Sequence, residues 1–139
     1  MPLLMSLVKI DLAFKFNKQN MKRDFNLVRS LLLYVEKQPP GKTIQGLTQE
    51  NYETEVISEH MALLIEEDFL KGEVSPSYSG MHYVVSGLTW KGHDFLDNAR
   101  NDTVWKKVMA DAENRGMSLS MSVLNGLLTK AAQKYMGLA

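Results

Sequence analysis

Residues 88–108, LTWKGHDFLDNARNDTVWKKV, decide how this chain can fold. Leu88 ends an alternating, strand-like run, and Thr89 is a residue type that caps helices with its side-chain oxygen. Gly92 has no side chain, so the first turn of the following helix can pack closely against a neighbouring segment. The stretch therefore predicts a strand-to-helix corner, with Trp105 extending the core behind it.

Two strongly periodic helices are predicted upstream of this corner. Residues 22–38 repeat apolar side chains at helical spacing until a Pro-Pro-Gly run ends the pattern. Residues 53–70 place Ile57, Met61 and Leu64 on one face, at the spacing of successive helical turns. Each helix therefore has an apolar face to bury against the rest of the domain.

Short strands and further helices complete the predicted order. Residues 43–47 predict a short strand, and residues 73–77 and 81–88 predict a hairpin around a Ser-Tyr-Ser-Gly turn. The remaining helices are predicted over residues 89–99, from 102 or 103 to 114, and over 119–136. We therefore expect an α+β, mostly helical fold: a winged-helix-like domain with a β-hairpin wing and additional C-terminal helices.

One segment departs from the standard helix-turn-helix pattern. Residues 44–51 contain Gly46 and show little helical periodicity. The first helix of a helix-turn-helix is therefore expected to be short or missing.

The first twenty residues differ in pattern from the rest of the chain. Residues 8–16 alternate apolar and polar side chains, which is typical of a strand with one buried face. Two interpretations stay open, an extra strand added to a sheet and a leader that contributes little to the fold. We therefore divide the chain into an N-terminal extension, residues 1–20, and a single domain, residues 21–139.

Composition limits the function more than it defines it. The 139 residues suit one domain, 45% are hydrophobic, and none is cysteine, which excludes disulfides and thiolate metal sites. No apolar run reaches the ~20 residues that span a bilayer. We expect a cytoplasmic protein without membrane contact.

Three segments together resemble a known family. They are MKRDFNLVRSLLLYVE from residue 21, ISEHMALLIEEDFL from residue 57 and LTWKGHDFLDNARNDTVWKKV from residue 88. In combination they are similar to the family called domain of unknown function 2513, over roughly residue 21 to the C-terminus. The resemblance implies a winged-helix-like fold and a bacterial or prophage setting, and it implies no activity or catalytic residue.

Charge on the second helix argues against its use as a DNA-reading helix. Residues 53–70 carry six acids and no Lys or Arg, whereas most DNA-binding energy comes from neutralising phosphates. The face opposite the apolar stripe is predicted to consist of Glu55, Glu59, Ala62 and Glu66. This face is our candidate for binding a partner protein, and its charge favours a basic one.

Basic residues elsewhere define the alternative function. Lys22, Arg23 and Arg29 lie on the first predicted helix, where they are the candidate DNA contacts of a transcriptional regulator. Such a regulator would contact DNA through the first helix, the wing or the N-terminal arm. This alternative rests on analogy with the winged-helix fold, so DNA binding is disfavoured.

The last helix is a candidate for self-association. One of its sides is apolar, and Gly126 on the same helix would allow another helix to approach closely. The candidate dimer residues are Leu124, Leu127, Leu128, Ala131 and Tyr135. Packing within the chain, against the first helix, is the competing interpretation.

Motifs for catalysis are not recognisable. His60 is expected to be a packing residue, and His82 and His93 fall on different predicted elements. There is no nucleophile elbow and no Gly-rich phosphate loop. We therefore expect no catalytic residue, no metal site and no cofactor, and an enzyme remains the least favoured class. The leading hypothesis is a non-catalytic binding module that acts through protein contacts as a dimer.

Overall fold

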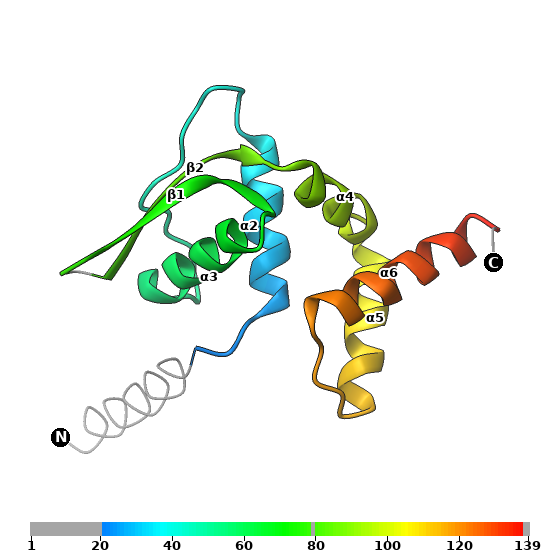
Figure 1. Cartoon of the computed structure of the whole chain (residues 1–139). Coiled ribbons are helices and arrows are strands. Elements are labelled where there is room, and N and C mark those ends of the chain that lie inside the picture. Colours follow the sequence, from blue (N-terminus) through cyan, green and yellow to red (C-terminus); the bar gives the residue numbers. More distant parts are fainter. Residues whose placement is uncertain (1–20, 79, 138–139) are drawn as a thin grey trace, which may run out of the picture.

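The computed structural model describes residues 21–78 and 80–137 (Figure 1). Within them the fold is α+β and mostly helical, as expected, with five helices and one antiparallel hairpin. In chain order the elements are α2 (Phe25–Lys37), α3 (Thr54–Glu66), β1 (Leu70–Ser77), β2 (Gly80–Leu88), α4 (Trp90–Ala99), α5 (Asp102–Asn114) and α6 (Met121–Tyr135). The strand considered for residues 1–20 lies outside the described residues.

Helix α2 runs through the middle of the protein. The hairpin and α3 lie on one side of it, and α4 leads to α5 and α6 on the other (Figure 1). The helix starts at Phe25 because the Asp24 side chain accepts a hydrogen bond from Leu27 N at 3.1 Å. Lys22 and Arg23 therefore precede the helix, although the sequence pattern placed them on it.

The hairpin is longer than predicted. One residue of the segment between α2 and α3 pairs with its second strand. Strands β1 and β2 pair from Leu70↔Leu88 to Ser77↔Gly80, with an irregularity between Lys71 and Gly72. Ile44 and Val85 exchange two backbone hydrogen bonds, of 2.8 and 3.0 Å. The strand predicted over residues 43–47 is thus reduced to one bridge. No helix forms between α2 and α3, in agreement with the weak helical pattern there.

The corner between β2 and α4 has the predicted construction. Thr89 Oγ1 accepts a hydrogen bond from Gly92 N at 3.0 Å and donates to the carbonyl oxygen of Asp68. A β-carbon built on Gly92 would lie 2.1 Å from the carbonyl oxygen of Phe69. The turn after α3 and the first turn of α4 are therefore in backbone contact, which only glycine permits at this position.

Helix α5 is attached to α2 through Trp105. The indole is buried, with 2% of the residue exposed, and its Nε1 donates to Asn26 Oδ1 at 2.8 Å. Asn101 Oδ1 caps the start of the helix by accepting from Val104 N. The prediction that Trp105 extends the core is confirmed.

The five described helices are 10 to 15 residues long. None within residues 21–78 and 80–137 is both long enough and apolar enough to cross a membrane.

Candidate functional site

The outer face predicted for α3 is only partly exposed. Glu55 and Glu66 are exposed and Glu59 is half-buried. Ala62 is 8% exposed and belongs to the core, so its assignment to the interaction face was wrong. The reason is that α3 packs against α2 and also against both strands of the hairpin, which widens the buried arc beyond the apolar stripe (Figure 1).

The C-terminal end of α3 is acidic. Glu66, Glu67 and Asp68 are consecutive and exposed, and no basic residue lies in the last turn of the helix. Acids here oppose the helix dipole. Lys91 from α4 provides partial compensation, because its Nζ donates to the carbonyl oxygen of Glu67 at 3.1 Å.

Arg29, one of the candidate DNA contacts, is held by protein groups. Its Nε and Nη2 donate to the carbonyl oxygens of Ala99 and Arg100 at 2.7 and 3.0 Å. Its Nη1 lies 3.4 Å from Asp102 Oδ1, and its guanidinium lies 5.4 Å from the centre of the Trp105 ring. Arg29 therefore fastens α2 to the α4–α5 corner, and its assignment as a DNA contact is corrected.

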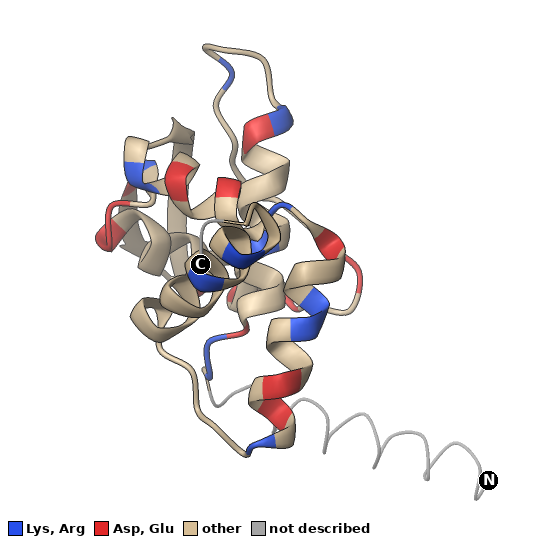
Figure 2. Ribbon diagram, turned by 90° about the vertical axis from the view of Figure 1, so that its right-hand side faces the viewer, with Lys and Arg blue, Asp and Glu red and all other residues tan. Residues whose placement is uncertain are grey.

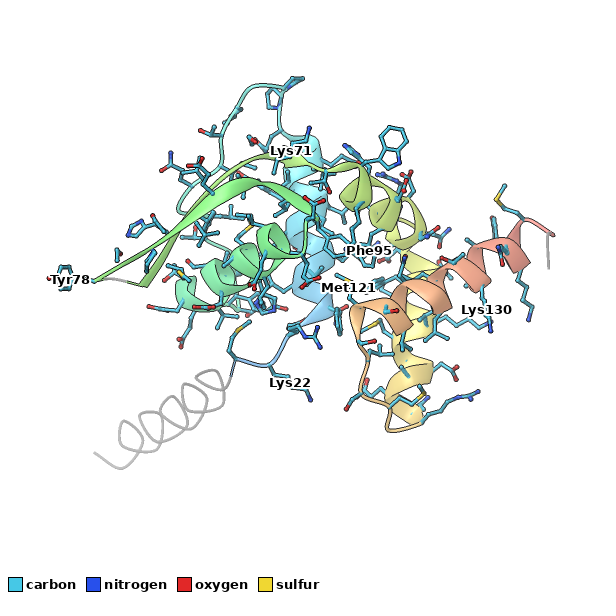
Figure 3. The ribbon with its side chains drawn as sticks, viewed as in Figure 1. Lys22, Lys71, Tyr78, Phe95, Met121 and Lys130 are labelled. Atoms are coloured by element: carbon cyan, nitrogen blue, oxygen red, sulfur yellow. The ribbon has the colours of Figure 1, made fainter. Side chains whose placement is uncertain are left out.

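Lys22 and Arg23 remain exposed at the start of the described chain. Lys22 extends away from the helices (Figure 3). The Arg23 guanidinium lies 5.6 Å from the centre of the Phe25 ring, which positions it beside the start of α2. These two residues are what remains of the predicted DNA-contact set.

The face that contains α5 and α6 carries both signs of charge. Along the ribbon of these helices, positions of Lys and Arg lie among positions of Asp and Glu (Figure 2). One close pair joins α2 to the end of α4, where both Arg100 amino groups donate to the Glu36 carboxylate at 2.6 and 2.7 Å. These hydrogen bonds from Arg100 hold the pKa of Glu36 below its usual value. A mixed surface of this kind offers DNA no continuous basic track.

The predicted dimer stripe of α6 divides into an inner and an outer part. Leu124 and Leu128 are fully buried within the chain, so they are corrected to core residues. Leu127 and Ala131 are half-buried, and Tyr135 is 79% exposed. The outer part therefore remains available for contact with another molecule.

An apolar groove lies between α5 and this outer part of α6. Its volume is about 680 Å³. Val104 and Val108 line it from α5, opposite Leu127, Ala131 and Tyr135 from α6. Charged side chains of both signs also line it, namely Lys107, Asp111 and Lys134. We call this the α5–α6 groove.

A buried polar network near the start of α2 was not predicted. His60 Nδ1 donates to Val56 O at 2.8 Å, and its Nε2 accepts from Asp24 N at 2.9 Å. Tyr52 Oη donates to Asp24 Oδ2 at 2.9 Å. Burial, followed by this bond to Asp24, raises the pKa of Tyr52 to about 12.

The interpretation of His60 as a satisfied packing residue is confirmed. Its partners lie 4 and 36 residues away, and only the nearer one could be inferred from helical spacing.

Metal chemistry has no visible basis in the part of the chain that is described. There, no three His, Cys, Asp or Glu side chains come together in a group able to hold a metal ion. The His60 ring nitrogens are both occupied by backbone groups.

Comparison with known proteins gives a family without an assigned activity. The family model described as "Hypothetical protein (DUF2513)" matches residues 22–118. An uncharacterised protein of Haemophilus influenzae is 32% identical over 107 residues, which cover 75% of this chain and 89% of the relative. No solved structure matches.

Proposed function

The chain belongs to the DUF2513 family, and we propose that it is a non-catalytic protein-binding module that works as a homodimer through the α5–α6 groove. The observation that carries this proposal is an apolar groove beside a tyrosine that is 79% exposed. Aromatic side chains are enriched at protein interfaces because they bury a large area and keep a polar tip. The Haemophilus influenzae relative is an uncharacterised protein.

A second copy of this chain is the proposed occupant of the groove. In a two-fold symmetric interface, a residue i that contacts a residue j of the partner is matched by the reverse contact. Asp111 of one copy can then meet Lys134 of the other, on both sides of the axis. The apolar side chains between these charges would be covered in the same step.

Ala131→Glu tests the location of this interface. Ala131 lines the groove and is half-buried, so a glutamate would insert a larger, charged side chain among the apolar groups of the contact. We expect the dissociation constant of self-association to rise about a hundredfold, since overpacking and the burial of a charge together cost about 3 kcal/mol. Sedimentation equilibrium over a concentration series measures this.

Gln133→Glu is the matched control. Gln133 is exposed on the same helix and does not line the groove, so the same new charge should leave self-association unchanged. If both variants weakened self-association equally, the cause would be overall charge. If Ala131→Glu did not weaken self-association, this groove would be excluded as the interface.

The exposed acids of α3 are proposed as a surface for a basic partner. Glu55 and Glu66 are exposed, Glu59 is half-buried, and α3 contains no Lys or Arg, so this surface complements a partner with positive charge. A winged-helix-like arrangement is supported by the order of α2, the Ile44 bridge, α3 and the hairpin. DNA binding by that fold is the alternative, supported here by the two exposed cations before α2.

Two labelled probes distinguish protein binding from DNA binding. They are an oligolysine peptide and a duplex DNA of random sequence, measured at the same ionic strength. We expect the peptide to bind and the duplex to bind only weakly, because phosphate contacts need a cluster of cations. Glu55→Lys with Glu59→Lys should weaken peptide binding at least about tenfold. Fluorescence anisotropy gives both affinities.

The DNA alternative makes the opposite prediction. Duplex affinity would be high, would fall steeply with salt, and would be lost in the Lys22→Ala, Arg23→Ala variant. That result would replace the protein-binding proposal for this surface.

A further inference from the structure

A second groove, distinct from the α5–α6 groove, lies where the two halves of the protein meet. It is bounded by the start of α2, the last turns of α3, the beginning of α4 and the first turn of α6. Met121, at the start of α6, lies on the side of this helix that faces α2 (Figure 3). The volume of about 580 Å³ falls in the range of small-molecule sites.

The walls of this groove are mainly apolar. Phe25 and Val28 come from α2, Leu64 from α3, and Phe69 from the turn that follows α3. These four side chains belong to the core, so the surface they present is fixed by packing. Met121 is half-buried and has three rotatable bonds, which lets it adjust to an occupant.

Two cationic side chains lie over aromatic rings of this apolar wall. The Arg23 guanidinium lies 5.6 Å from the Phe25 ring centre, and Lys91 Nζ lies 4.5 Å from the Phe69 ring centre. Both rings and both cations line the same groove. Each cation is thereby positioned at the groove by stacking on an aromatic side chain, with its charge partly exposed to solvent.

The remaining polar groups leave the two cations in excess over the acids that line the groove. Ser120 Oγ accepts from Val123 N, which leaves the amides of Met121 and Ser122 without a partner inside the helix. Glu67 is the one acid among the described residues that line the groove. An occupant with negative charge at one end is therefore favoured over a cationic one.

We propose that this groove binds a small amphipathic carboxylate, an apolar body with one anionic end. The apolar body packs on Phe25, Phe69 and Met121. The carboxylate lies between Arg23 and Lys91, where it accepts charge-assisted hydrogen bonds. A ligand bound in this way would contact both the start of α2 and α6. This binding does not depend on self-association through the α5–α6 groove.

Decanoate is the probe for this proposal, and decanamide is its neutral counterpart. Titration of the isotope-labelled full chain, followed by backbone amide NMR, reports both affinity and location. We expect decanoate to shift the amides around Phe25, Phe69 and Met121 and to bind at least about tenfold more tightly than decanamide.

Arg23→Gln with Lys91→Gln is the decisive variant, and Lys22→Gln is its matched control. Lys22 is an adjacent exposed cation that does not line the groove. We expect the double variant to lose the preference for decanoate while its affinity for decanamide stays the same. Lys22→Gln should behave as the native protein does.

Four results would overturn the proposal. One is equal affinity of the native protein for the two probes, and another is an unchanged preference in the double variant. The third is a set of shifted amides confined to α5 and the C-terminal end of α6. The fourth is the absence of any binding at accessible concentrations.

Discussion

Gly92→Ala is expected to lower the free energy of unfolding by about 3 kcal/mol, at the upper end of what overpacking costs. The new β-carbon would lie 2.1 Å from the Phe69 carbonyl oxygen and 3.3 Å from Leu88 Cδ2. The carbonyl cannot rotate away freely, because it accepts a hydrogen bond from Thr89 N at 3.2 Å. The corner would have to open, which also strains the Thr89 cap. Urea denaturation measures the change.

Gly126→Ala is the matched control for this prediction. Gly126 lies within α6, and a β-carbon built on it would meet no atom within 4 Å. Alanine should therefore stabilise the helix by about 0.5–1 kcal/mol, because glycine loses more conformational freedom on folding. If Gly92→Ala were as stable as the native protein, the turn after α3 and the first turn of α4 would not be in backbone contact.

Trp105→Ala should cost about 3–5 kcal/mol of stability, as expected for a large buried aromatic side chain. The substitution removes the indole from the core and leaves a cavity between α2 and α5. It also removes the hydrogen bond to Asn26 and the ring beneath the Arg29 guanidinium. Thermal and urea unfolding followed by far-ultraviolet circular dichroism measure the loss.

The other tryptophan of the chain provides the comparison. Trp90 is 84% exposed at the first turn of α4, so Trp90→Ala should change stability by no more than about 0.5 kcal/mol. In that variant Trp105 is the one remaining tryptophan, and its burial predicts blue-shifted fluorescence. Equal stability losses at the two positions, or red-shifted emission from Trp105, would contradict the described packing.

The elements that the sequence predicted best are those fixed by local chemistry. Thr89 and Gly92 marked the β2–α4 corner because a cap and a close backbone approach each require a particular residue type. The stripe of Ile57, Met61 and Leu64 identified the buried side of α3 because the helical period alone determines it.

The features that the sequence could not predict depend on which elements pack together. Ala62 was placed outside because a helical wheel does not show that the hairpin covers a second side of α3. Arg29 was taken as an available cation because its acceptors, the carbonyl oxygens of Ala99 and Arg100, lie some seventy residues further along the chain. Both grooves likewise arise from surfaces that meet only in the folded protein.

Self-association through the α5–α6 groove can be tested by isotope-filtered NMR on a mixture of labelled and unlabelled chains. In such a sample only contacts between different copies give cross-peaks. We expect cross-peaks between the Tyr135 ring and the methyl groups of Val104 or Val108. A sample that self-associates without these cross-peaks, or one that stays monomeric at the highest concentration studied, would exclude the proposed dimer.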